Sequence, residues 1–216
     1  VDDDMLVKAV KVSAANCFLN SGQTCTAWTR LVVPQSKLEA ALEILREVVA
    51  KNLDSSRMGP MVSAAHRERV LGYMTRAEAE GATVVAGGAT MPFPASQGWY
   101  VTPTVYAHVD PDSEIAREEV FGPVMTVFTY PDDDIESGLS LVNDSQYGLS
   151  GAVWAADQRL GELVASRVEA GQVDVNGASF NLEAPFGGFK MSGLGRELGR
   201  AGIDDYLEYR SVQLPQ

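Results

Sequence analysis

At residues 18–25 the sequence reads Phe-Leu-Asn-Ser-Gly-Gln-Thr-Cys. A helical pattern leads into this stretch, because apolar residues recur every four positions up to Phe18. Asn20 and Gly22 then favour a turn that ends the helix, and a β-rich run follows at residues 30–33. A helix–turn–cysteine–strand junction presents the Cys25 thiol beside backbone N–H groups. The arrangement therefore predicts a nucleophile, and with it an enzyme.

The two cysteines are expected to differ. A free thiol has a pKa of about 8.5, so a few per cent is thiolate at neutral pH unless a helix-terminal turn or a base raises that fraction. Cys25 could instead be a buried structural cysteine, but the glycine-containing turn before it favours exposure. Cys17 lies in the helical pattern beside Phe18 and is predicted to be core. Neither His66 nor His108 lies in a recognisable Cys–His motif, so a Cys–His hydrolase is poorly supported.

Composition narrows the class of protein further. The chain has 216 residues, 45% hydrophobic and 21% charged, which suits one globular domain. Its net charge of −12 argues against nucleic acid and anionic membrane surfaces as partners, and no apolar run is long enough to predict a membrane span. Two cysteines favour a reducing compartment, the cytoplasm, over a disulfide framework. Two isolated histidines make a metal site improbable.

Helical and strand patterns alternate along the chain. Helices are expected up to residue 18, at 38–49, between 60 and 81, at 132–143, at 159–167 and near 195–201. Strands are expected at 30–33, 83–86, 124–130, 150–155, 172–176 and 206–214. Residues 100–109 alternate but contain Pro103, which predicts two short strands or an edge strand. The class is α/β, with a largely parallel or mixed sheet.

Four segments together resemble one enzyme family. They are Phe18–Cys25, Glu118-Glu-Val-Phe-Gly-Pro-Val124, Asn143-Asp-Ser-Gln-Tyr-Gly-Leu149 and Pro185-Phe-Gly-Gly-Phe-Lys-Met-Ser-Gly-Leu-Gly-Arg-Glu-Leu-Gly199. In order and spacing they are similar to the motifs of the NAD(P)-dependent aldehyde dehydrogenase superfamily, over essentially the whole chain. The resemblance implies the C-terminal part of such an enzyme. Residues 1–205 would form its three-layer α/β/α catalytic domain, and residues 206–216 an oligomerisation strand.

The resemblance also implies a mechanism. Cys25 would add to an aldehyde as a thiolate, hydride would pass to NAD or NADP, and the resulting thioester would be hydrolysed to a carboxylic acid. Sulfur suits these steps because it is a strong nucleophile and then a good leaving group. The backbone N–H of Cys25 would form half of an oxyanion hole.

Further residues acquire roles by the same resemblance. Glu119 would bind the nicotinamide ribose hydroxyls and Phe121 would pack near the nicotinamide. His66 and Arg69 correspond to weaker ribose contacts, although exposed helix residues are an equal alternative.

The resemblance also assigns a substrate pocket and an accessory acid. Thr24, Thr26, Phe180 and Phe186 would line the aldehyde tunnel, although the aromatics could simply pack in a glycine-rich loop. Glu197 would serve a proton relay, with an ion pair to Arg196 or Arg200 as the alternative.

Several family features are missing from the sequence. The general-base glutamate of a Leu-Glu-Leu-Gly-Gly segment would lie just before Val1, and the cofactor-binding domain would precede it. We therefore expect part of a longer protein, a homodimer or homotetramer when whole, and no aldehyde oxidation by this chain alone. Two alternatives stay open. One is a CoA-acylating member or a thioester-forming esterase, and the other is a non-catalytic oligomerisation module.

Overall fold

The computed structural model describes residues 3–53, 57–90, 93 and 97–215. Its α-helices are α1 (Asp3–Phe18), α2 (Leu38–Asn52), α3 (Ala64–Ala79), α4 (Glu114–Arg117), α5 (Ile135–Asn143) and α6 (Gln158–Ala165). Its strands are β1 (Arg30–Pro34), β2 (Thr83–Ala86), β3 (Thr104–Ala107), β4 (Val124–Tyr130), β5 (Tyr147–Gly148), β6 (Ser150–Val153), β7 (Gln172–Val175) and β8 (Phe189–Lys190). No described helix is long and apolar enough to cross a membrane.

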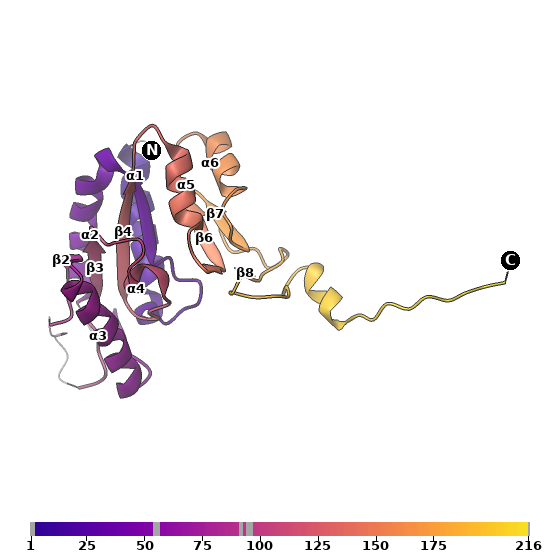
Figure 1. The fold of residues 1–216 in the computed structure, drawn as a ribbon, viewed down its shortest axis with the longest axis horizontal. Helices are drawn as coiled ribbons and strands as arrows, with labels where there is room; N and C mark the ends of the chain where they lie inside the picture. Colours follow the sequence, from indigo (N-terminus) through magenta and orange to yellow (C-terminus); the bar gives the residue numbers. More distant parts are fainter. Residues whose placement is uncertain (1–2, 54–56, 91–92, 94–96, 216) are drawn as a thin grey trace.

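A four-stranded sheet with the order β1-β4-β3-β2 forms the centre of the fold (Figure 1). β4 runs parallel to both of its neighbours, and β2 is antiparallel to β3. β6 and β7 form a separate parallel pair, and β5 and β8 a short antiparallel pair. The predicted mixed α/β class is therefore confirmed.

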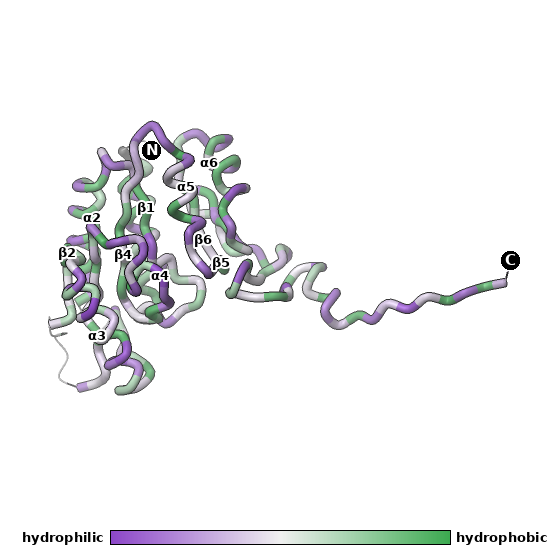
Figure 2. The backbone as a smooth tube through the Cα atoms, in the orientation of Figure 1, coloured by the Kyte–Doolittle hydropathy of each residue, from purple (hydrophilic) through white to green (hydrophobic). Residues whose placement is uncertain are grey.

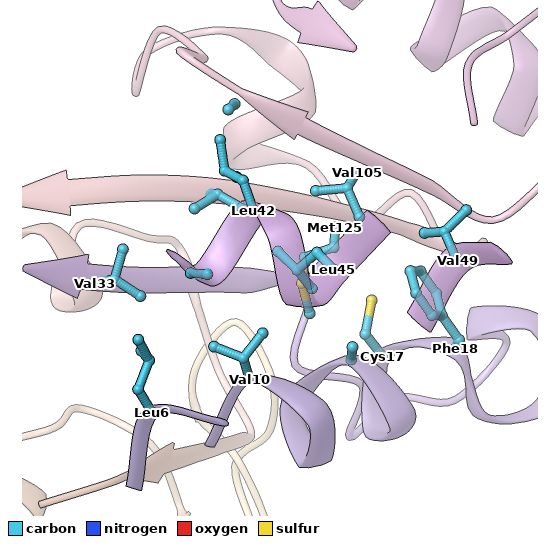
Figure 3. Packing of buried hydrophobic residues seen from close by; sticks show 14 of the residues in the cluster. Leu6, Val10, Cys17, Phe18, Val33, Leu42, Leu45, Val49, Val105 and Met125 are labelled. Carbon is cyan, nitrogen blue, oxygen red and sulfur yellow. The ribbon is translucent and has the colours of Figure 1, made fainter. Parts of the chain in front are cut away.

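Helices cover both faces of this sheet and make three layers. On one face α1 and α2 bury Val10, Cys17 and Leu45 against Val105 and Met125 of the strands (Figure 3). On the other face α3 and α4 pack against β3 and β4 through a second apolar cluster. Figure 2 shows the apolar residues of β1 and β4 in the middle of the molecule. Because β4 is apolar and covered on both faces, it reads as a nearly continuous hydrophobic run.

β3 corrects one prediction from the sequence. It is fully buried and lies between β2 and β4, so it is a central strand rather than an edge strand. Pro103 immediately precedes its first residue. A proline at that position removes no N–H from the hydrogen-bonded part of the ladder.

The glycine-rich C-terminal region differs from prediction in two ways. No helix forms near 195–201, because Leu198 and Gly199 have φ of 62° and 54°, which a right-handed helix excludes. A 3₁₀ segment at Ala201–Tyr206 follows instead. Residues 207–215 form no strand and extend away from the body (Figure 1), while Gln216 lies outside the described residues. A strand needs a partner edge, and within the described residues this tail pairs with none. Its role in oligomerisation stays a prediction.

Candidate functional site

The turn after α1 carries the predicted nucleophile. Asn20, Ser21 and Gly22 all have left-handed φ values, 51°, 59° and 72°, so the backbone reverses sharply where the helix ends. The Ser21 hydroxyl donates to the carbonyl of Gly59 over 2.6 Å, which ties the turn to a distant segment. Cys25 follows on the surface, with an exposed thiol. The prediction of an exposed Cys25 and a buried Cys17 is confirmed.

Gly22 is required by a close approach of two backbones. A Cβ at Gly22 would overlap the carbonyl group of Gly122 and lie 2.8 Å from the nitrogen of Pro123. Its φ of 72° also disfavours any side chain. The cysteine turn therefore rests directly on the backbone that leads from Phe121 into β4.

Gln23 also organises this turn, although it was not among the site residues predicted from the sequence. Its amide oxygen accepts from the N–H of Val62 over 2.8 Å. Its amide nitrogen donates to the carbonyls of Asn20 at 3.1 Å and Pro60 at 3.3 Å. One side chain thus closes the turn and fastens it to the segment before α3. A polar side chain two positions before the cysteine was the only sequence signal.

α3 holds the loop that carries Glu119 and Phe121. His66 Nε2 lies 2.7 Å from the carbonyl oxygen of Phe121, and since a carbonyl only accepts, Nε2–H is assigned as donor. Arg69 donates to the carbonyls of Val120 at 2.8 Å and Glu119 at 2.9 Å. These bonds stabilise a loop in which Phe121 has a φ of 56°. Contact of His66 or Arg69 with a cofactor stays a prediction.

The cysteine turn and the carboxylate loop meet at one edge of the sheet. Cys25 precedes β1 and Glu119 precedes β4, and these strands are parallel neighbours, so both segments lie at the amino ends of their strands. Both line a cavity of about 560 Å³, together with Thr24 and Phe121. The carboxylate of Glu119 is exposed there, while the ring of Phe121 is half-buried. The structure therefore brings the predicted nucleophile together with Glu119 and Phe121, two of the four predicted cofactor residues.

Three of the four predicted pocket residues gather at a second hollow. Thr26, Phe180 and Phe186 line a space of about 400 Å³ beside Trp28. The rings of Phe180 and Phe186 meet edge to face, with centroids 5.9 Å apart and planes at 73°. Thr24 lies apart from them in the larger cavity.

Glu197 takes part in the fold through its backbone. Its N–H donates to the carbonyl of Phe186 over 2.6 Å and its carbonyl accepts from the N–H of Phe186 over 2.7 Å, while its carboxylate is exposed. Arg196 donates to the carbonyls of Gly188 and Gly195. Glu197 therefore helps to position the Phe186 segment, and a proton-relay role stays a prediction.

Ion pairs and burial shift the pKa values of several side chains in and near the larger cavity. Arg117 binds the carboxylates of Asp112 and Asp144, and its hydrogen bond holds the pKa of Asp144 below its usual value. Burial lowers the pKa of Arg30, whose guanidinium donates to the carbonyl of Leu141 over 3.0 Å. Burial also raises the pKa of Cys17 far above that of a free thiol, so this cysteine stays protonated.

Fold and site together define an α/β protein that presents a cysteine beside a carboxylate loop at the amino edge of a parallel sheet. The sequence profile described as the aldehyde dehydrogenase family matches residues 1–212. The chain belongs to the aldehyde dehydrogenase family.

Individual relatives agree with this assignment. A geranial dehydrogenase from Castellaniella defragrans is 41% identical over 99% of this chain and 44% of its own length. An aldehyde dehydrogenase C mutant from Pseudomonas syringae, solved with NAD+ and octanal, has a TM-score of 0.88 and 37% identity over 94% of this chain and 43% of its own. A Mycobacterium tuberculosis aldehyde dehydrogenase solved with NAD+ has a TM-score of 0.88 and 33% identity over 100% of this chain and 44% of its own. The chain thus spans less than half the length of these relatives.

Proposed function

We propose that this chain is the nucleophile-bearing part of an NAD(P)+-dependent aldehyde dehydrogenase that oxidises an aldehyde to a carboxylic acid. The observation that carries the proposal is the shared cavity, in which an exposed Cys25 lies with Glu119 and Phe121. The relatives named geranial dehydrogenase and solved with octanal support an aldehyde as substrate.

The cofactor residues have suitable chemistry. An exposed carboxylate at Glu119 can accept hydrogen bonds from two ribose hydroxyls, and the half-buried ring of Phe121 offers an apolar surface beside it. The fixed backbone between them, held by His66 and Arg69, keeps the carboxylate and the ring at a constant spacing. When bound, a nicotinamide cofactor would supply the acceptor for the hydride that leaves the substrate carbon once Cys25 has added to it.

The chain's own residues carry the bond-making steps at sulfur. The Cys25 thiolate attacks the carbonyl carbon and forms a C–S bond, and the carbonyl oxygen takes the negative charge. The Cys25 N–H donates to that oxygen. After oxidation the carbon is a thioester, which water attacks, and the C–S bond breaks to release a carboxylic acid and regenerate the thiol. A base for the water, apart from an accessory role of Glu197, would come from polypeptide beyond this chain.

NADH formation from an aldehyde tests the proposal. The full-length parent protein should form NADH, its Cys25→Ala variant should form none, and residues 1–216 alone should form none. A matched Cys17→Ala variant should retain activity, because Cys17 is buried in the core. An active Cys25→Ala parent would overturn the mechanism. Activity of residues 1–216 alone would overturn the proposal that the base for the water comes from polypeptide beyond this chain. The CoA-acylating alternative predicts instead that the parent protein forms NADH only when coenzyme A is added.

The exposed tail supports assembly of the parent protein. Tyr206, at the end of the 3₁₀ segment, is 88% exposed, and Tyr209, Val212 and Leu214 on the extended tail that follows are each at least two-thirds exposed. We propose that this tail pairs with a neighbouring subunit in a homodimer or homotetramer.

The free thiols of Cys17 and Cys25 fit a reducing compartment such as the cytoplasm.

A further inference from the structure

The hollow beside Trp28 has walls of two chemical kinds. Aromatic rings line one part of it, and polar side chains line the rest together with Thr26. The aromatic residues are Trp28, Phe180 and Phe186, and the other polar residues are Asn16, Ser150, Gln172 and Asp174. Within the part of the chain that the structure describes, no lysine, arginine or histidine lines this space. The hollow therefore offers ring faces, hydrogen-bonding groups and a negative charge.

Asp174 supplies the charge of the hollow. It lies two positions after Gln172 on β7, so the two side chains point to the same face of the strand. The amide nitrogen of Gln172 donates to a carboxylate oxygen of Asp174 over 3.0 Å. Among the described residues no lysine or arginine pairs with Asp174, which is half-buried. A neutral amide compensates the charge of this carboxylate only in part, and a bound cation would complete the compensation.

Trp28 is fixed in the wall by hydrogen bonds at both of its N–H groups. Its indole Nε1–H donates to the Ser150 hydroxyl over 3.1 Å, and its backbone N–H donates to the side-chain oxygen of Asn16 over 2.7 Å. Trp28 therefore has no free donor that would compete for Asp174. Its ring, with the edge-to-face pair of Phe180 and Phe186, can cover the methylene groups of a ligand. The face of such a ring also attracts a cation.

The hollow adjoins the cavity that holds Cys25. Trp28 and Ser150 line both spaces. Thr26 follows Cys25 directly, and since consecutive Cα atoms are about 3.8 Å apart, one wall of the hollow begins a few ångström from the nucleophile. An aldehyde whose carbonyl carbon lies at Cys25 can therefore place its other end in the hollow.

We propose that the hollow binds the protonated amino group of an aldehyde that carries a primary amine at its far end, and that Asp174 accepts hydrogen bonds from this ammonium group. The assignment deepens the proposed function and rests on it, because it takes Cys25 as the group that attacks the aldehyde. An alkylammonium group resembles the lysine side chain, whose pKa is about 10.4, so it is charged at neutral pH. The net charge of −12 attracts such a cation toward the protein.

Steady-state kinetics of the full-length parent protein test the proposal with two pairs of aldehydes. 3-Aminopropanal is paired with butanal, and 6-aminohexanal with heptanal, because the members of each pair have equal numbers of non-hydrogen atoms. In at least one pair the amino aldehyde should have the higher kcat/KM. Asp174→Asn should lower the ratio of the two kcat/KM values by about 10- to 100-fold, the value of a hydrogen bond to a charged group.

Two further variants control for charge and for folding. Glu162 is exposed on α6 and lines neither cavity, so Glu162→Gln removes an equal charge and should leave the ratio unchanged. Asp174→Glu keeps the carboxylate and should retain most of the preference, so a ratio lost only in Asp174→Asn is not a failure to fold. Equal loss of kcat/KM for both members of a pair would give Asp174 a structural role and overturn the proposal. A parent that prefers butanal and heptanal would overturn it as well.

Calorimetry supplies a second measurement that requires no turnover. The parent protein should bind 6-amino-1-hexanol more tightly than 1-heptanol, and Asp174→Asn should abolish this difference. A parent that oxidises none of the aldehydes would contradict the proposed function, while the difference in binding would still support the ammonium site. Equal binding of the two alcohols by the unmodified parent would overturn the ammonium site, whether or not the parent oxidises aldehydes.

Discussion

Replacement of Gly22 by alanine should test the contact between the cysteine turn and the Phe121 loop. Gly22 has a φ of 72°, where an L-residue costs about 1–2 kcal/mol. Its new Cβ would also overlap the carbonyl of Gly122. Because that neighbour is backbone and cannot rotate away, overpacking adds about 1–3 kcal/mol. We therefore expect Gly22→Ala to lower the free energy of unfolding by about 2–5 kcal/mol, a large share of the roughly 5–15 kcal/mol of a typical domain.

Alanine substitutions at two other glycines distinguish the cost of the left-handed backbone from the cost of the steric overlap. Gly81 has a φ of 99° and, among the described residues, a Cβ there meets no atom within 4 Å, so Gly81→Ala carries the backbone cost alone. At Gly59 a Cβ likewise meets no described atom within 4 Å and φ lies outside the left-handed range, so Gly59→Ala should change stability by less than about 0.5 kcal/mol.

Urea unfolding of the three variants and the unmodified chain supplies the measurement. Gly22→Ala should be the least stable variant, with a free energy of unfolding at least about 1 kcal/mol below that of Gly81→Ala. The slope of the free energy of unfolding against urea concentration should be unchanged. Equal destabilisation by the two substitutions would refute the close approach of Gly22 to Gly122. Neutrality of Gly22→Ala would refute the left-handed turn as well.

Three further predictions concern single side chains. Iodoacetamide should modify Cys25 in the folded chain and leave Cys17 unmodified until urea unfolds the protein, because only Cys25 is exposed; mass spectrometry of the two peptides would contradict this if both were modified at the same rate. Glu119→Gln in the parent protein should raise the Kd for NAD+ by about 10- to 100-fold, the value of one charged hydrogen bond, measured by calorimetry with Glu118→Gln as control; an unchanged Kd would remove Glu119 from the cofactor site. Arg117 lowers the pKa of Asp144 in the folded state, so the stabilisation from this pair is present above the unfolded pKa of about 3.9 and is lost as the pH falls toward the folded pKa. Asp144→Asn should therefore lose less stability than the unmodified chain on acidification below about pH 4, and identical acid unfolding curves would argue against the pair.

The sequence by itself determined the features that depend on local pattern. Four-residue apolar spacing determined α1, and with it the burial of Cys17, while Asn20 and Gly22 ended that helix and exposed Cys25. The family motifs were also present in the sequence alone. These properties depend on residues within a turn or two of each other, so neighbouring residues are sufficient to predict them.

Tertiary structure alone decided which distant segments meet. Pro103 suggested an edge strand, yet packing between β2 and β4 made β3 central. His66 and Arg69 donate hydrogen bonds to carbonyls that lie 55 and 50 positions away along the chain, and no local pattern encodes these partners. The cavity shared by Cys25 and Glu119 likewise depends on strand order, because it requires β1 and β4 to be parallel neighbours. Such features follow from how the sheet assembles as a whole, because hydrogen bonds and packing between remote segments exist only once the chain has folded.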